Sequence, residues 1–191
     1  QFEQRTGNQL SIDMVAVRDK TKKRDIDLTN ITVTEDPKEI ISNPDIDIVV
    51  EVMGGEHPAY ELIKESLENK KIVVTANKEV ISKHKKEFFE TAKKNDVDIY
   101  YEAAVGGGIP LIRALKVGYA ANKISSFYGI LNGTTNFILT KIQQEGKEFN
   151  DVLKEAQDKG FAEADPTMDV SGLDSAYKLD ILSAVVFKSD T

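Results

Sequence analysis

The chain has 191 residues, of which 40% are hydrophobic and 30% charged, a composition typical of a folded globular protein. A formal net charge of -7 argues against nucleic acid or an anionic membrane as the main partner, and no apolar run approaches the ~20 residues that a membrane helix needs. The absence of cysteine excludes disulfides, thiolate catalysis and zinc–thiolate sites within this chain, and it is consistent with a cytoplasmic location.

Both ends of the sequence resemble interrupted elements. Residues 1–7 have no signal-peptide pattern and look like the end of a helix that is already under way. Residues 178–187 look like a helix that has only just ended. We therefore expect the chain to be the middle of a longer protein.

The first half predicts an α/β domain. Short β-branched runs at residues 12–18, 46–52, 72–75 and 97–101 alternate with helical patterns at residues 59–67 and 80–92. Buried strands alternating with helices favour a parallel sheet of the nucleotide-binding type. The G-x-G-x-x-G motif of such folds is absent. We therefore expect a truncated, Rossmann-like, doubly wound sheet over residues 1–101, with its first strand and glycine loop upstream of Gln1.

After Tyr101 the pattern changes to that of an α+β catalytic or dimerisation domain, which we assign to residues 102–191. Helices are predicted at residues 111–117, 149–159 and 173–186, and another, capped by Thr134 or Thr135, runs to residue 144. Residues 124–131 alternate like a strand, and residues 163–171 form a polar loop. A sheet covered on one face only often pairs with its copy, so we expect a homodimer.

Three positions in the first half lie where open α/β sheets bind ligands, at the carboxyl ends of strands. Arg18 and Asp19 follow the first strand; an acid there favours NAD and a base favours NADP, or both are simply solvated. Gly54 lets the backbone approach a ligand, or it serves a plain turn. Lys78 could meet a cofactor or a substrate carboxylate, or it is a surface lysine.

Two segments of the second half carry stronger signals. Residues 101–110 include three successive glycines, a bare backbone that can turn carbonyl oxygens onto a hard cation beside Glu102 or act as a hinge. Residues 160–178 hold four acids, and Asp174 and Lys178 stand on one helix face, four residues apart. A surface pair of this kind contributes only ~0.3–0.5 kcal/mol. The apolar residues around Lys178 instead indicate a partly buried lysine, which needs a partner or a function.

Four motifs, in this order, resemble those of homoserine dehydrogenase. They are Thr75-Ala76-Asn77-Lys78; Tyr101-Glu102-Ala103-Ala104-Val105-Gly106-Gly107-Gly108-Ile109-Pro110; Gly129-Ile130-Leu131-Asn132-Gly133-Thr134-Thr135-Asn136; and Gly172-Leu173-Asp174 with Lys178. The resemblance implies an oxidoreductase that interconverts L-homoserine and L-aspartate 4-semialdehyde with NAD or NADP, in the biosynthesis of threonine, methionine and isoleucine.

The same resemblance implies roles for single residues. Lys178 would be the acid–base residue and Lys78 would lie near the cofactor and the reacting oxygen, while Glu163, Asp169 and Asp174 would bind the amino-acid substrate. The residues implied near the cofactor are Arg18, Gly54, Lys78, Gly160 and Glu163. A sodium-like monovalent cation would be held by backbone oxygens of Glu102, Val105, Gly107 and Ile109.

Two alternatives remain open at this stage. The chain could be a non-catalytic fragment that keeps only oligomerisation or metabolite binding, which the missing glycine loop favours. It could also belong to a different nicotinamide oxidoreductase. An active homoserine dehydrogenase, by contrast, predicts that Lys78 and Lys178 meet near Glu163 and Asp174 in one cleft between the domains.

Overall fold

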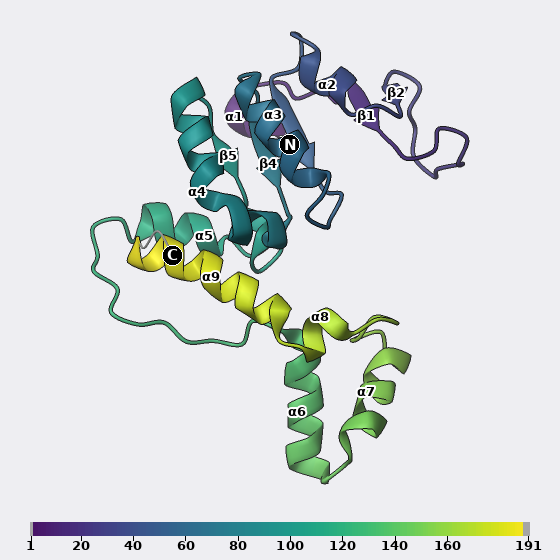
Figure 1. Ribbon diagram of the computed structural model, residues 1–191, viewed down its shortest axis with the longest axis vertical. Helices are drawn as coiled ribbons and strands as arrows, with labels where there is room; N and C mark the ends of the chain where they lie inside the picture. Colours follow the sequence, from purple (N-terminus) through teal and green to yellow (C-terminus); the bar gives the residue numbers. More distant parts are fainter. Residues whose placement is uncertain (1, 189–191) are drawn as a thin grey trace. The chain divides into compact units, whose positions relative to one another are not determined.

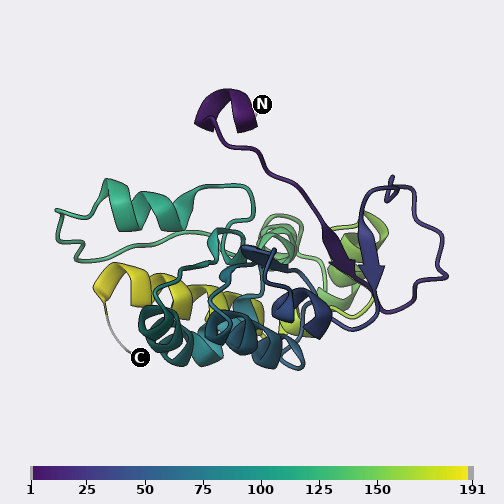
Figure 2. The ribbon, with the colours of Figure 1, turned by 90° about the horizontal axis from the view of Figure 1, so that it is seen from above.

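The computed structural model describes residues 2–188, without the side chain of Phe2. Gln1 and residues 189–191 lie outside the described residues. The chain divides into two compact units (Figures 1 and 2). The first contains residues up to 74 together with residues 86–100, and the second contains residues 75–85 and those from 101 onward.

Parallel strands form the centre of the first unit. Strand β1 (Met14–Ala16) pairs in parallel with β2 (Thr32–Thr34), with Met14 opposite Thr32. A second sheet has the order β3 (Ile48–Glu51), β4 (Ile72–Thr75) and β5 (Ile99–Tyr100), and β4 and β5 are parallel. The predicted α/β class with a parallel sheet is confirmed for this part of the chain.

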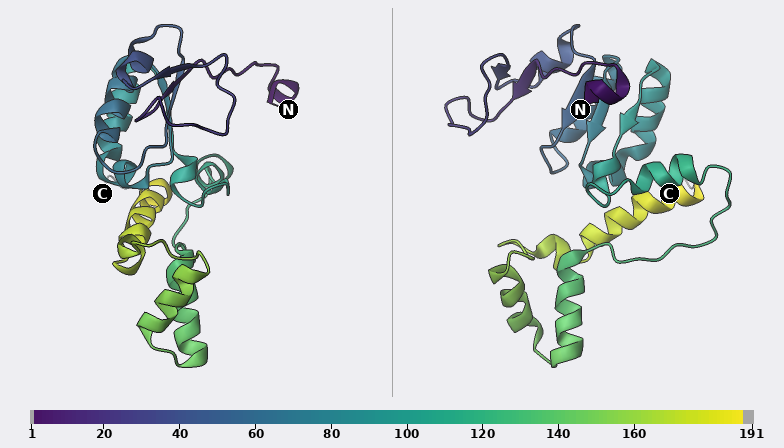
Figure 3. Two further views of the ribbon diagram at one scale, coloured as in Figure 1. Left: turned by 90° about the vertical axis from the view of Figure 1, so that its right-hand side faces the viewer. Right: turned by 180° about the vertical axis from the view of Figure 1, so that it is seen from behind.

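Helices alternate with these strands along the chain. The first unit contains α1 (Phe2–Thr6), α2 (Lys38–Ser42), α3 (Ala59–Glu68) and the second half of α4 (Lys78–Asn95). Helix α3 lies beside that half of α4 (Figure 3), where the rings of Tyr60 and Phe88 stand 5.7 Å apart and Tyr60 Oη donates to Glu87 at 2.8 Å. Ile63, Leu67 and Val73 are no more than 1% exposed, so the predicted apolar stripes do form a core.

The second unit, as described, is built from helices. A short 3-10 helix η1 (Glu102–Ala104) precedes α5 (Leu111–Arg113), which continues into the π-helix η2 (Ala114–Gly118). Helices α6 (Gly133–Glu145) and α7 (Phe149–Asp158) form a hairpin (Figure 1), followed by α8 (Thr167–Val170) and α9 (Leu173–Phe187). The core of the hairpin consists of buried apolar side chains: Ile138, Val152, Ala156 and Ala162.

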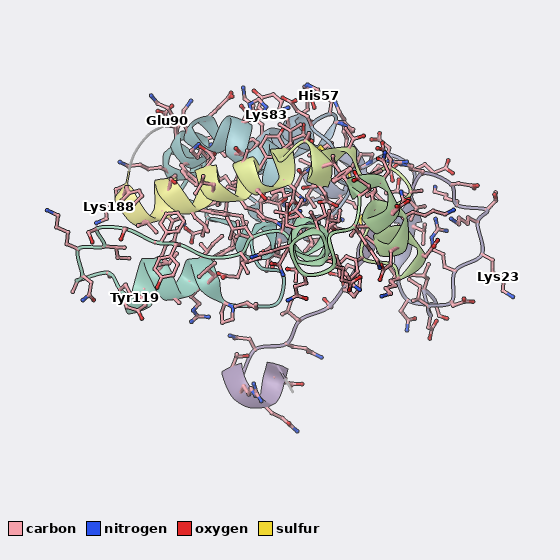
Figure 4. All side chains as sticks on the ribbon, turned by 90° about the horizontal axis from the view of Figure 1, so that it is seen from below. Lys23, His57, Lys83, Glu90, Tyr119 and Lys188 are labelled. Carbon is pink, nitrogen blue, oxygen red and sulfur yellow. The ribbon has the colours of Figure 1, made fainter. Side chains whose placement is uncertain are left out.

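The strand predicted at residues 124–131 is wrong for the structure as described. These residues belong to a long irregular connection, in which Tyr128 is 100% exposed and Ile130 74% exposed. Alternation predicts a strand only where a second strand accepts its hydrogen bonds, and the described part of the second unit contains none beyond Thr75, the last residue of β4. The connection begins after Tyr119, at the end of η2, and contacts α9 near Lys188 (Figure 4) through Phe127 and Phe187, whose ring centroids are 5.9 Å apart.

The predicted cap of α6 is also corrected. The helix begins at Gly133, and Asn132 is its N-cap, because the Asn132 side chain accepts a hydrogen bond from the amide of Thr135 at 2.8 Å. Gly160 follows the end of α7 with a φ of 75°, and Gly172 caps α9 with a φ of 80°. Both glycines therefore stand where the sequence predicted a helix end and a helix start.

Candidate active site

The carboxylate of Asp174 is the centre of the candidate site. Asp174 lies in the first turn of α9 and is only 5% exposed. Its Oδ1 lies 2.9 Å from Lys78 Nζ, and its Oδ2 accepts from Lys178 Nζ at 2.7 Å and from Asn132 Nδ2 at 2.8 Å. One buried acid thus receives ammonium groups from the start of α4 and from the next turn of α9, and an amide from the N-cap of α6; all of these residues lie in the second unit.

The turn before α4 places Lys78. Thr75 and Asn77 are buried, and the Thr75 hydroxyl accepts from the amide of Asn77 at 2.9 Å. Asn77 Oδ1 in turn accepts from the amide of Val80 at 3.2 Å, so Asn77 caps the helix. This turn, held by two buried side chains, sets the position of Lys78, the first residue of α4.

Lys178 is held from two sides. Its side chain is 19% exposed, which confirms the partly buried lysine expected from the apolar surroundings on α9. Nζ donates to the carbonyl oxygen of Leu131 at 2.8 Å as well as to Asp174. An ammonium group has three N–H donors, so these two fixed bonds orient the third. A lysine held in this way can hand a proton to one defined place.

Asp174 and Lys178 border a hollow of about 710 Å³, which is large enough for a small metabolite. Its wall includes Asn132, Gly160, Asp169, Asp174 and Lys178, together with residues of α6. Burial raises the pKa of Asp174, but the hydrogen bonds from Lys178, Asn132 and Lys78 outweigh it, so the pKa lies below its usual value. Asp174 is therefore an anion at neutral pH.

The other acids expected at the site are placed differently. Asp169, on α8, accepts from Asn132 Nδ2 at 2.7 Å and so joins the same group as Asp174. Glu163 is exposed and does not line the hollow; its main-chain oxygen accepts from Gln157 at 3.2 Å. The structure therefore brings Lys78, Lys178, Asp169 and Asp174 together and leaves the carboxylate of Glu163 outside this group.

Three of the residues expected near a cofactor remain to be placed: Arg18 and Gly54 follow strands of the first unit, and Gly160 lines the hollow. Arg18 is exposed after β1, and the neighbouring Asp19 accepts from the amide and hydroxyl of Thr21 at 2.7 and 2.6 Å. These bonds lower the pKa of Asp19. Gly54 follows β3 with a φ of 75°, a backbone conformation that suits glycine. Gly160 lies in the second unit, on the wall of the hollow.

The loop expected to hold a cation is a tight turn. Gly106 and Gly107 have φ values of 80° and 57°. The Glu102 carboxylate accepts from the amides of Ile112 and Arg113, both at 2.8 Å, so its charge is used at the start of α5. Only the main-chain oxygens of the loop suit a cation, and among the described residues no cluster of three acidic or histidine side chains forms a metal site.

Sequence reasoning did not assign a role to Asn132. It appeared only within a motif, although an asparagine just before Gly-Thr-Thr is a recognisable helix cap. In the structure Asn132 is 6% exposed and contacts both Asp169 and Asp174.

Comparison with known proteins gives the family. The family model described as the NAD-binding domain of homoserine dehydrogenase matches residues 1–102, more than half of the chain. The chain belongs to the homoserine dehydrogenase family. A second family model, homoserine dehydrogenase itself, matches residues 110–191.

Individual homoserine dehydrogenases agree with this assignment. The protein from Bacillus subtilis is 47% identical over 181 residues, which cover 95% of this chain and 42% of that protein; the one from Pseudomonas aeruginosa is 46% identical over 183 residues, covering 96% and 42%. This chain thus spans about two fifths of these relatives. Across the described residues, no helix is long and apolar enough to cross a membrane.

Solved structures of the family have the same fold. A homoserine dehydrogenase from Thiobacillus denitrificans is 45% identical with a TM-score of 0.88, and the match covers 96% of this chain and 42% of that one. A hyperthermophilic archaeal homoserine dehydrogenase in complex with NADPH is 34% identical with a TM-score of 0.73, covering 79% and 47%.

Proposed function

We propose that this chain carries the acid–base and substrate residues of an enzyme that interconverts L-homoserine and L-aspartate 4-semialdehyde. The observation that supports this most strongly is the Asp174 carboxylate, buried between Lys78 and Lys178 at the wall of a hollow. Reversible alcohol oxidation needs a group that exchanges a proton with the oxygen while hydride leaves or arrives at carbon. A lysine fixed by two hydrogen bonds meets that need.

The proposed roles divide the reaction among the lysines and the acid. In the oxidation direction neutral Lys178 takes the hydroxyl proton as the C–H bond breaks, and in the reduction direction its ammonium form returns the proton to the aldehyde oxygen. The nicotinamide, when bound, accepts or supplies the hydride. Asp174 orients Lys178, and Lys78 lies near the reacting oxygen, where its positive charge stabilises the alkoxide character of the transition state.

Substrate recognition is proposed for Glu163, Asp169 and Asp174, which together would receive the ammonium group of the amino acid. Asp169 has the strongest structural support for this contact, because it lines the hollow and its Oδ1 bond is to a neutral amide. Asp174 already contacts two lysines, so its contribution to substrate binding is mainly the negative charge of the pocket.

The cofactor is proposed to be NAD or NADP, with Arg18, Gly54, Lys78, Gly160 and Glu163 as contacts. The match to the NAD-binding domain supports this, and residues 1–101 are proposed as that domain and residues 102–191 as the catalytic one. The Asp19 carboxylate is hydrogen-bonded to Thr21, and Arg18 beside it is exposed. This arrangement is compatible with the 2′-phosphate on the ribose of NADP. Measuring KM for NAD and for NADP decides the preference.

The remaining features of the proposal concern the loop after Tyr101 and assembly. A sodium-like monovalent cation would be held by main-chain oxygens of Glu102, Val105, Gly107 and Ile109. Measuring activity in sodium, potassium and choline salts tests this site.

A homodimer is proposed, because residues 124–131 leave Tyr128 and Ile130 uncovered, and light scattering of the full-length protein tests it. We propose a cytoplasmic location, typical of amino-acid biosynthesis.

Turnover of homoserine by the full-length protein tests the function. Lys178→Ala should lower kcat by roughly 1000-fold with either cofactor, because it removes the proton acceptor. The matched control is Lys123→Ala, which removes an exposed lysine of the same unit and should leave kcat unchanged. A wild-type protein that binds homoserine without turnover would indicate a binding module, and one that oxidises only another amino acid would overturn the substrate.

A further inference from the structure

Asn132 connects two carboxylates that would otherwise repel each other. Its Nδ2 donates one hydrogen bond to Asp169 Oδ1 at 2.7 Å and the other to Asp174 Oδ2 at 2.8 Å. An amide nitrogen has two hydrogens, so its donor capacity is used up by the two acids. The asparagine therefore fixes the relative position of α8 and the start of α9 at the wall of the hollow.

The other end of the same amide is fixed as well. Asn132 Oδ1 accepts from the amide of Thr135 at 2.8 Å and from its hydroxyl at 2.9 Å, which leaves no rotational freedom to the amide plane. Asn132 is buried, with 6% of its surface exposed, and a buried amide with all four bonds made is costly to move. The carboxylates are thus positioned by a group that is itself rigid.

The preceding residue extends the connection to Lys178. The Leu131 carbonyl oxygen accepts from Lys178 Nζ at 2.8 Å, so the backbone that carries Asn132 also holds the lysine. Lys178 Nζ and Asn132 Nδ2 share the same oxygen of Asp174, which ties the direction of the lysine to the amide.

We propose that Asn132 is a positioning residue for the acid–base group, holding Asp169 and Asp174 so that Lys178 points at the reacting oxygen. This inference rests on the proposed function. It assigns to Asn132 an effect on kcat that passes through Asp174 and Lys178 and not through the stability of α6. The neutral amide is essential here. It donates a hydrogen bond to each of the two carboxylates but adds no positive charge, so Lys78 and Lys178 remain the cations that pair with Asp174.

Two substitutions separate positioning from capping. Asn132→Ser and Asn132→Asp both keep a side-chain oxygen at the N-cap, where Ser, Asp and Asn are all good caps, so α6 should remain stable. Serine loses the paired donors, and aspartate adds a third carboxylate to the two already present. We expect kcat to fall on the order of 100-fold for serine and further for aspartate, with KM for the cofactor unchanged.

A double-mutant cycle gives the decisive readout in the full-length protein. If Asn132 acts through Lys178, Asn132→Ser should cause little further loss of kcat in a Lys178→Ala background, whereas a merely structural role gives additive losses. Asn150→Asp, an exposed asparagine in the first turn of α7, is the matched control and should keep wild-type kcat.

The outcomes distinguish this inference from the proposed function. If the wild-type protein does not turn over homoserine, both are overturned. If it does, but Asn132→Ser retains kcat within about twofold or the losses in the cycle are additive, only the role of Asn132 is overturned. Should Asn132→Asp fail to fold, the serine variant alone decides.

Discussion

Helix α9 carries two aspartates that each meet a lysine of α4, and the two pairs differ in almost everything else. Asp174 is 5% exposed, contacts two lysines and an asparagine, and borders the hollow. The side chain of Asp180 is 28% exposed; it accepts from Lys85 Nζ at 2.8 and 2.9 Å and from the Ser82 hydroxyl at 2.7 Å.

The difference shows that an aspartate–lysine pair between α4 and α9 can serve either the fold or the chemistry. Asp180 and Lys85 bond to each other and to Ser82 and do not line the hollow, so this pair joins α4 to α9. At Asp174, two lysines, an asparagine and a second carboxylate gather around one buried acid, a costly arrangement that is typical of a site for chemistry. Six residues further along α9, the pair of Asp180 and Lys85 holds the two helices together.

The largest effect should come from Asp174→Asn. The substitution keeps the shape but removes the charge between Lys78 and Lys178, so the lysines repel each other and Lys178 loses its orientation. We expect kcat for homoserine oxidation to fall roughly 1000-fold. The matched variant is Asp180→Asn, on the same helix, and an equal loss of kcat there would erase the distinction between the two pairs.

Lys85→Met should act on stability instead. It keeps the buried stem but leaves Asp180 without its cation, and because Asp180 is partly exposed we expect the free energy of unfolding to drop by about 2 kcal/mol. Urea unfolding followed by circular dichroism measures this drop, and kcat below the melting temperature should change little. An unchanged urea midpoint would show that the pair does not stabilise the helix contact.

Acid should weaken the group at Asp174. The folded-state pKa of Asp174 is lowered, so its charge stabilises the fold above the unfolded-state pKa, and this contribution is lost as pH falls through the lower folded-state value. The stability difference between wild type and Asp174→Asn should therefore be full at pH 6 and shrink below about pH 4. Thermal unfolding of both proteins between pH 6 and pH 3 tests this, and a difference that grows in acid contradicts it.

The smallest effect is expected for Glu155, a partly exposed carboxylate of α7 whose lysine partners all come from the surface. It contacts Lys141, Lys147 and Lys159, and the hydrogen bond from Lys159, followed by that from Lys147, lowers its pKa to about 2. Because water screens these contacts, Glu155→Gln should shift Tm by only about 1–2 °C, less in high salt. A larger, salt-independent shift would mean that the number of partners matters more than burial.

The sequence predicted the first unit well because its signals are local. The run at residues 46–52 is β-branched on every apolar position, and it forms β3; the pattern at residues 59–67 forms α3. Strand β2 was missed because Val33 is its only apolar residue, and helix α2 was missed because five residues are too short for a helical periodicity to register. The strand predicted at residues 124–131 was wrong for a different reason. Alternation indicates which side chains share a face, but it does not show whether a partner strand exists.

The site was predicted in part. Asp174 and Lys178 are neighbours on one helix, so their contact follows from spacing alone. Lys78 and Asn132 reach the same carboxylate from 96 and 42 residues away, and only the resemblance to a family placed Lys78 there. No local rule reveals that one asparagine would hold two acids, because the second partner exists only after α8 and α9 have folded.

The ring of Phe161 offers an optical consequence. It lines the hollow, is 54% exposed, and lies 4.8 Å from the ring of Phe137. Because the chain contains no tryptophan, Phe161→Trp would give it a single indole at the rim. Its emission would report ligand entry directly, which would allow substrate affinity to be measured in variants too slow to assay by turnover.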